Sequence, residues 1–402
     1  MFRTIAATYR EAFSGLSRTV WLLSVASLVN RSGTMVMPFL TLYLVSKRGF
    51  TTSQAGEVLG LYGVAAMAAS YASGWLSDHV SPLWVMKASL ALTGVSFLVL
   101  GPLRSRFAIV AMVFVLSLVG EAFRPANLAA LAAATGPVDR ARGFALLRLA
   151  VNMGMTLGPS VGGFLALYDY GWLFVADGVT CLLAAGLLWL VPAGAEAAKP
   201  RRDRQSGASS SPWRDGPFLA MMFLMFLLAT VVFQIVSTFP LTLRDLYGLS
   251  EARIGLILAV NTLIIVLFEM VLIHRLSGRG EAMERVGFGA FLFCSGLALL
   301  PLGSTFLFAA FTVVVWTVGE MLAIPIASAV VAGRAKEESL GRYMGAYNLT
   351  FACSYVAAPL IGTAVYQAWG PRALWYGCGV AGVFIWLGFH GLAVARRRHL
   401  DA

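Results

Sequence analysis

The sequence predicts an all-α membrane protein, in which twelve transmembrane helices form two pseudo-symmetric six-helix bundles. Of the 402 residues, 59% are hydrophobic and 12% are charged, whereas soluble domains average ~25% charged residues. Apolar runs of about 20 residues, the length that crosses a bilayer, alternate with short polar segments. Features of the first half also recur in the second at an offset of 199 to 200 residues.

Each predicted span is an apolar run bounded by polar residues or by Gly and Pro. Dividing 402 by 12 gives about 33 residues, which is one spanning helix with a short loop. Residues 1–18 are polar and basic, so we expect no cleavable signal peptide. The expected spans are 20–46, 54–77, 82–102, 107–132, 142–167, 170–191, 217–243, 252–275, 284–302, 306–331, 342–367 and 371–394.

The distribution of basic residues predicts the orientation of these spans. Of the 30 Lys and Arg residues, 20 fall on the side of the N-terminus, 7 on the opposite side and 3 inside spans. Cytoplasmic loops carry such an excess, so we expect both termini in the cytoplasm and a multi-pass protein of the plasma (inner) membrane. The net charge of +11 is therefore an orientation signal, and we expect no nucleic-acid partner.

The chain divides into two predicted bundles, residues 1–191 and 217–402, joined by a charged cytoplasmic linker at 192–216. Val119-Gly120-Glu121 recurs as Val318-Gly319-Glu320, and Pro159 recurs as Pro359. Such a repeat predicts two bundles related by an axis along the membrane normal, which alternate access to a cavity between them.

The fifth predicted span carries a stripe of small residues. Gly154, Gly158 and Gly162 recur at every fourth position and share one helix face. A neighbouring helix can approach this face to backbone contact. Pro159 removes a backbone donor, so we expect a kink there.

The stretch Gly-x-x-x-Gly-Pro-x-x-Gly-Gly, completed by Gly163, resembles the helix 5 motif of drug:proton antiporters in the major facilitator superfamily. The resemblance covers essentially the whole chain and implies the major facilitator fold. It implies that Gly154, Gly158, Pro159, Gly162 and Gly163 seal one end of the transport path.

A second, partial resemblance lies between the second and third spans. Gly74-x-Leu76-x-Asp78 matches the first half of the superfamily's loop signature, but the basic residues that usually follow are absent. The resemblance implies a gating role for Gly74 and Asp78. Arg142 or Arg140 is the expected partner of Asp78.

Charged residues inside the spans are candidates for proton coupling. A charge at mid-bilayer is costly, and it usually faces the bundle interior and pairs. Glu121 and Arg124 lie three residues apart on one helix face, and Glu320 is the repeat counterpart of Glu121. An arginine in helix 4 resembles the basic position of the antiporter branch, which implies a part in proton coupling.

Arg31 lies near the middle of the first span, and Asp177 and Glu269 are candidate partners or proton carriers. Burial favours a neutral acid and a nearby arginine favours the anion, so a carboxyl group that alternates between these surroundings can carry a proton. For Asp177, near a helix end, a structural cap or pair is the favoured interpretation. Glu320 has two open interpretations, a packing network and a proton site.

Other polar and aromatic side chains could line the substrate cavity or pack between helices. With few charges and many aromatic and Met residues, this cavity should suit lipophilic or amphipathic cargo. The candidates for the substrate cavity are Asn30, Arg31, Asn127, Asn152, Gln234, Asn261, Trp316 and Asn348.

The sequence therefore predicts a secondary transporter that exports small lipophilic compounds in exchange for protons. The alternative is a proton-coupled importer of a small nutrient such as a peptide. No nucleophile elbow, phosphate loop or metal-ligand spacing occurs, so we expect neither an enzyme nor an ATP-driven pump. We expect a monomer without cofactor or metal, driven by the proton gradient, whose four cysteines are small packing residues.

Overall fold

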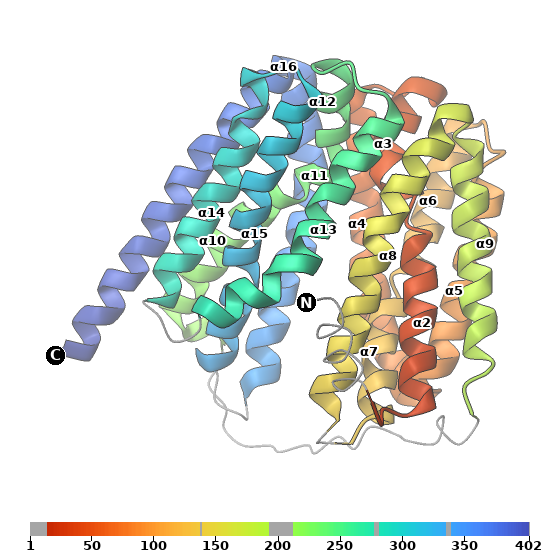
Figure 1. The fold of residues 1–402 in the computed structure, drawn as a ribbon, viewed down its shortest axis with the longest axis horizontal. Helices are drawn as coiled ribbons and strands as arrows, with labels where there is room; N and C mark the ends of the chain where they lie inside the picture. Colours follow the sequence, from red (N-terminus) through yellow and green to blue (C-terminus); the bar gives the residue numbers. More distant parts are fainter. Residues whose placement is uncertain (1–13, 137–138, 193–211, 277–280, 335–338, 402) are drawn as a thin grey trace. The chain divides into compact units, whose positions relative to one another are not determined.

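The computed structural model describes residues 14–136, 139–192, 212–276, 281–334 and 339–401. Within these ranges the chain is helical and contains no strand (Figure 1). Most of the predicted linker at 192–216 lies outside the described residues. The helices are α2 (Arg18–Ser32), α3 (Val36–Arg48), α4 (Thr52–His79), α5 (Pro82–Leu100), α6 (Arg106–Gly120), α7 (Phe123–Ala134), α8 (Arg140–Tyr168), α9 (Gly171–Leu188), η2 (Pro212–Arg214), α10 (Gly216–Val232), α11 (Gln234–Ser237), α12 (Phe239–Asp245), α13 (Glu251–Leu276), α14 (Ala282–Ala298), η3 (Leu300–Leu302), α15 (Phe306–Arg334) and α16 (Leu340–Asp401).

In the part of the chain that the structure describes, nine helical segments are long and apolar enough to cross a membrane. The prediction of twelve differs for three reasons, the first of which is that α4, which contains the second predicted span, is not among the nine. The first predicted span is two helices of 15 and 13 residues, each short of a full crossing. The last two predicted spans form the 62-residue α16, in which Gly370 has a φ of 80°. Only glycine adopts this conformation readily, so the chain turns there. The number twelve stays a prediction.

The chain forms two compact units. Unit 1 consists of Met1–Val36 and Val64–Arg202. Its described helices pack around a core that includes Leu23, Leu90, Leu131 and Leu188, each at most 1% exposed. Local sequence fixes where its helices begin: the hydroxyl of Ser17, for example, accepts a hydrogen bond from the N–H of Val20 and caps α2.

Unit 2 consists of Met37–Gly63 and Asp203–Ala402. It therefore includes α3 and the first part of α4, which precede the predicted linker in the sequence. Its core is aromatic: the ring of Trp316 meets those of Phe239 and Phe293 edge-on, with centroids 6.2 and 5.6 Å apart. The predicted bundles 1–191 and 217–402 stay a prediction.

The first helix of each predicted bundle is interrupted at corresponding positions. α2 ends at Ser32 and α3 begins at Val36, while α10 ends at Val232 and α11 begins at Gln234. The two helix ends lie 200 residues apart, which matches the offset of the sequence repeat. Interrupted helices leave backbone groups that need partners outside the helix, and those partners define the candidate site.

Candidate functional site

The glycine stripe of α8 lies against α2 and the start of α3. A Cβ atom added at Gly154 would lie 2.6 Å from Cβ of Arg31, and one at Gly162 would lie 2.9 Å from Cβ of Met35. A Cβ atom at Gly158 would lie 3.1 Å from the backbone oxygen of Arg31. These distances confirm the predicted backbone approach and identify the first span as the partner. Pro159 and Gly163, on the same helix, are buried.

Asp177 is fully buried in α9 and caps the start of α3. Its carboxylate accepts hydrogen bonds from the N–H of Met35 at 3.0 Å and of Val36 at 2.9 Å. These groups start a helix and have no partner within it. The interpretation of Asp177 as a structural cap is therefore confirmed. Its proposed pairing with Arg31 is not found in the described part of unit 1.

Asn30 and Arg31 are the residues of α2 that lie just before the interruption. The Nδ2 group of Asn30 donates to Sγ of Cys181 on α9 at 3.4 Å, and Arg31 is partly buried. Asn152 on α8 is also partly buried, and its backbone oxygen accepts a hydrogen bond from Thr156. Three of the predicted cavity residues thus belong to unit 1, on the two helices joined by the glycine stripe.

Asn127 joins α7 to α2. It is 4% exposed, and its Nδ2 group donates to Oγ of Ser27 at 2.8 Å. Ser27 in turn donates to the backbone oxygen of Leu23 at 2.8 Å. The structure therefore gives Asn127 an interhelical bond, the second of its two predicted roles.

The fourth predicted span contains a turn between Glu121 and Arg124. α6 ends at Gly120, and α7 begins at Phe123. Glu121 is partly buried and Arg124 is exposed. Glu121 and Ala122 keep right-handed helical dihedral angles, and Arg106–Ala134 counts as one apolar span, so the expectation that Glu121 and Arg124 share a helix face stays a prediction.

A polar cluster joins α13 to α15 in unit 2. Asn261 donates from Nδ2 to Oε2 of Glu320 at 2.9 Å and to Oγ1 of Thr317 at 3.0 Å. Thr317 is fully buried, and Glu320 is partly buried. Glu269, on α13, is 5% exposed and lies close enough to interact electrostatically with Glu320. Two predicted proton-coupling residues and one predicted cavity residue are thus brought together, although they span 59 positions of sequence.

Gln234 uses its whole amide group within unit 2. Its Nε2 group donates to the backbone oxygens of Ala358 at 2.7 Å and Thr230 at 3.3 Å. Its Oε1 accepts from the hydroxyls of Thr238 at 2.9 Å and Ser237 at 3.2 Å. Two donors and two lone pairs are thereby satisfied. Gln234 fastens the interrupted α10–α11 segment to α16, so its predicted role as a substrate ligand is not supported.

Two further cavity candidates differ in their surroundings. Trp316 is fully buried between Phe239 and Phe293, so it is a packing residue and its prediction as a cavity residue is corrected. Asn348 is exposed on α16. The sequence alone could not separate these two cases, because both lie in apolar spans.

Ion pairs gather at the ends of the helices that are predicted to be cytoplasmic. Arg142 pairs with Asp139 at 2.9 Å and donates to the backbone oxygen of Ser14. The side chain of Asp78, its predicted partner, is not among those that the structure describes, and neither is that of Arg140. The surroundings of Gly74 are likewise not described. The predicted latch therefore stays a prediction.

Asp215 is a site that the sequence did not indicate. It caps α10 by accepting from the N–H of Phe218 at 3.1 Å, and both of its oxygens accept from Arg334 at 2.6 Å. Tyr343 donates to it at 3.1 Å. The hydrogen bonds from Arg334 hold the pKa of Asp215 below its ordinary value, although partial burial acts in the opposite direction. The cluster ties α10, α15 and α16 together.

A close contact between α4 and α16 was also missed. A Cβ atom added at Gly56 would overlap Oγ1 of Thr363, and one at Gly60 would lie 2.9 Å from Cγ of Leu360. A Cβ atom added at Gly63 would lie 2.9 Å from Cγ2 of Val356. The spacing Gly56-x-x-x-Gly60 is the signal that could have found it. We refer to these residues as the α4–α16 contact.

Among the described residues, no group of three His, Cys, Asp or Glu side chains could hold a metal ion. Cys181, Cys294 and Cys378 are free and buried, as expected of packing residues, and Cys353 is free and partly buried. The expectation of no cofactor stays a prediction.

Comparison of the sequence with known families gives one match, to the family described as the Major Facilitator Superfamily, over residues 20–353. The chain is similar to the multidrug resistance protein MdtH of Aeromonas hydrophila, with 23% identity over 383 residues, 90% of this chain and 92% of that protein. It is also similar to a Na(+), Li(+), K(+)/H(+) antiporter of Planococcus maritimus, with 23% identity over 387 residues, 87% of this chain and 88% of that protein.

The fold is similar to those of solved transporters. A mutant of the peptide transporter POT in complex with alafosfalin gives a TM-score of 0.81 at 16% identity, with 96% of each chain covered. A mutant of the nucleoside transporter NupG gives 0.78 at 12% identity, covering 93% of this chain and 100% of that one. At these identities the likeness concerns the fold alone.

Proposed function

Because this chain belongs to the major facilitator superfamily, we propose that it exports small lipophilic or amphipathic compounds in exchange for protons, by alternating access. It is a membrane transporter; the substrate class, the direction and the coupling ion are the proposal. We further propose that it works as a monomer in the inner membrane, with both termini in the cytoplasm. The names of two relatives support the proposed export in exchange for protons, since one is called a multidrug resistance protein and the other a cation/proton antiporter.

The observation that carries the proposal is the cluster of Glu320, Asn261 and Thr317, with Glu269 nearby. Two carboxylates in an apolar helix bundle repel each other, and no arginine or lysine is hydrogen-bonded to Glu320 in the described part of unit 2. Such a pair is suited to hold one proton between its members. The Asn261 amide fixes one oxygen of Glu320 by a hydrogen bond that a change in helix packing would break or restore.

Alternating access requires contacts that open and close during the cycle. The glycine stripe of α8 and the α4–α16 contact are built from small residues, which let packed helices separate and meet again without interlocking side chains. We propose that both are gating contacts. Gly74, Asp78 and Arg142 remain the proposed elements of a cytoplasmic latch.

Transport into proteoliposomes under an imposed pH gradient tests the proposal, with ethidium and other cationic dyes as substrates. Glu320→Gln, Glu269→Gln and Glu121→Gln remove one carboxylate each. We expect gradient-driven transport to be lost in at least one of the three while gradient-independent substrate exchange continues. Glu284→Gln is the matched control, because Glu284 forms exposed ion pairs with Arg397 and His390. Full coupling in all three variants would refute the proton assignment.

An importer of small nutrients is the second candidate function. It is favoured by the similarity of the fold to a solved peptide transporter. Direction distinguishes the two: an exporter releases protons from everted vesicles when substrate is added, whereas an importer carries protons and substrate in the same direction. Collapse of both signals by an uncoupler is expected in either case, since each function depends on the proton gradient.

A further inference from the structure

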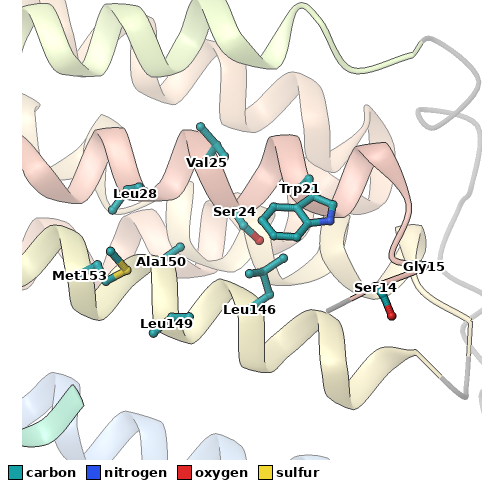
Figure 2. Close-up of a pocket in the computed structure, with 10 residues that line it drawn as sticks. All are labelled: Ser14, Gly15, Trp21, Ser24, Val25, Leu28, Leu146, Leu149, Ala150 and Met153. Atoms are coloured by element: carbon teal, nitrogen blue, oxygen red, sulfur yellow. The ribbon is translucent and has the colours of Figure 1, made fainter. Parts of the chain in front are cut away.

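A groove of about 580 Å³ lies between α2 and α8 in unit 1 (Figure 2). Trp21, Ser24 and Leu28 line it from α2, and Leu146 and Met153 line it from α8. None of these residues belongs to the polar clusters described above. The volume falls within the range of sites that hold drug-sized molecules, which is roughly 300–1,000 Å³.

The wall of the groove contains one buried hydroxyl without a partner. Ser24 is 2% exposed, and its Oγ has no hydrogen-bond partner among the described residues. The other serines within α2 behave differently: Ser27 and Ser32 each donate at 2.8 Å to the carbonyl oxygen four residues earlier. Figure 2 shows the Ser24 hydroxyl on the side of α2 that faces α8. Buried polar groups are normally satisfied, so the Ser24 hydroxyl, without a partner among the described residues, has hydrogen-bonding capacity left for a molecule in the groove.

The remaining lining favours an aromatic compound without charge. None of the lining residues is charged, and most of them are apolar. An ion would therefore lose its hydration without finding an opposite charge. The indole of Trp21, 43% exposed, offers a flat apolar surface to another ring. A hydrocarbon chain fits this wall less well, because it has no group that could bond to Ser24.

The groove ends where the glycine stripe begins. Leu28 lines the groove, and its backbone oxygen would lie 2.8 Å from a Cβ atom added at the neighbouring Gly154. Met153 lies beside Gly154 in the sequence and also lines the groove. A compound held here would therefore lie directly against the contact proposed as a gate.

We propose that the groove between α2 and α8 binds an uncharged aromatic compound whose single polar group hydrogen-bonds to Ser24. The natural ligand is a transported compound, a point that rests on the proposed function. Binding to the groove does not rest on it, because binding needs no proton gradient.

Binding of N-phenyl-1-naphthylamine, an uncharged aromatic amine, to the full-length purified protein tests the inference by fluorescence titration. Ser24→Ala removes the hydroxyl, and we expect about 3- to 10-fold weaker binding, the range for one hydrogen bond. Met153→Trp fills the groove and should weaken binding at least as much. The matched controls are Ser32→Ala, whose hydroxyl already has a partner, and Leu157→Trp, one turn further along α8 and 49% exposed compared with 45% for Met153. Both controls should bind like the wild type.

Wild-type affinity in Ser24→Ala would overturn the inference, as would equal losses in the two controls. If Met153→Trp does not fold, Ser24→Ala decides the matter alone. Displacement of the probe by dioleoyl phosphatidylglycerol at comparable concentrations would show a lipid site and would also overturn it. If the probe binds through Ser24 but is not moved by a pH gradient, the proposed function fails and the groove stands.

Discussion

Single carboxylates in this protein hold interrupted helices together. Asp177 accepts two backbone N–H groups at the start of α3, and Asp215 does the same work at the start of α10 with one N–H group and an arginine. Both sites lie at helix N-termini, where the helix dipole favours a negative charge. Their difference is exposure: Asp177 is fully buried, whereas the side chain of Asp215 is 17% exposed.

Replacing Asp177 by Asn should destabilise the fold. Oδ2 accepts from both Met35 and Val36, so an amide oxygen there keeps both bonds, but the NH₂ group in the place of Oδ1 then lies about 3.0 Å from the N–H of Met35, donor against donor. We expect a loss of about 1–3 kcal/mol, measured as a lower melting temperature in detergent. Asp169→Asn is the control, since Asp169 bonds to the N–H of Gly171 at an exposed position. A melting temperature equal to that of the control would contradict the role of Asp177 as a buried cap.

The Asp215–Arg334 pair should make the stability of the protein depend on pH in the acidic range. Because the pKa of Asp215 is lowered in the folded state, the pair stabilises the protein above the unfolded-state pKa of ~3.9, and this stabilisation is lost as the pH falls through the lower folded-state value. Arg334→Gln should therefore reduce the free energy of unfolding at pH 7 by about 1–2 kcal/mol, the contribution of a charged hydrogen bond that is partly exposed. This loss is measured as a lower melting temperature. The difference from the wild type should shrink between pH 5 and pH 3.

Asp139→Asn provides the comparison for this pH series. Asp139 also pairs with an arginine, Arg142, but the two side chains are 42% and 37% exposed. Exposed pairs contribute little, so this variant should melt close to the wild type at every pH. A pH-independent difference between wild type and Arg334→Gln would show that the arginine acts through packing rather than through the charge of Asp215.

At the scale of helices, glycine positions decide which helices meet at backbone distance. The sequence predicted the α8 stripe from its spacing of four, and the structure supplied its partner, α2. The α4–α16 contact has the same physical basis, with a less regular spacing of Gly56, Gly60 and Gly63. A regular stripe is visible in the sequence because it depends on local periodicity alone.

Gly154→Ala should separate α2 from α8. Its methyl group would lie 2.6 Å from Cβ of Arg31 and 2.8 Å from the backbone oxygen of Leu28, and backbone cannot move aside cheaply. We expect about 1–3 kcal/mol of lost stability, measured by thermal unfolding. Gly186→Ala is the control in the same unit, because a Cβ atom there meets nothing within 4 Å. That control should be neutral or more stable by up to ~1 kcal/mol, as alanine favours helices. Equal melting temperatures for the two variants would contradict the packing argument.

For the whole molecule, alternating access predicts that the α4–α16 contact opens during transport. A Cβ atom at Gly60 would lie 2.9 Å from Cγ of Leu360, so cysteines at both positions are within reach of a disulfide. In the double variant Gly60→Cys and Leu360→Cys, oxidation should stop transport almost completely, and a reductant should restore it. The transport rate is measured before oxidation, after oxidation and after reduction, and mass spectrometry identifies the disulfide.

The two single-cysteine variants control for oxidation elsewhere in the chain, since three of the four native cysteines are buried. They should transport equally well with and without oxidant. Undiminished transport by a fully bridged double variant would mean that this contact stays closed throughout the cycle, and the proposed gating role of α4 and α16 would be wrong.

The sequence by itself determined the helical membrane class, the apolar spans and the close approach along α8. Each of these follows from hydrophobicity or periodicity within a short window, which is encoded locally. Only the tertiary structure decided that Asp177 is a cap, that Gln234 is bonded to Ala358 of α16 as well as to its own segment, and that Trp316 is packed. It also decided that the Ser24 hydroxyl has no hydrogen-bond partner among the described residues. The physical reason is that the state of a polar group inside an apolar bundle depends on donors and acceptors brought from distant positions, 142 residues away for Asp177 and Met35.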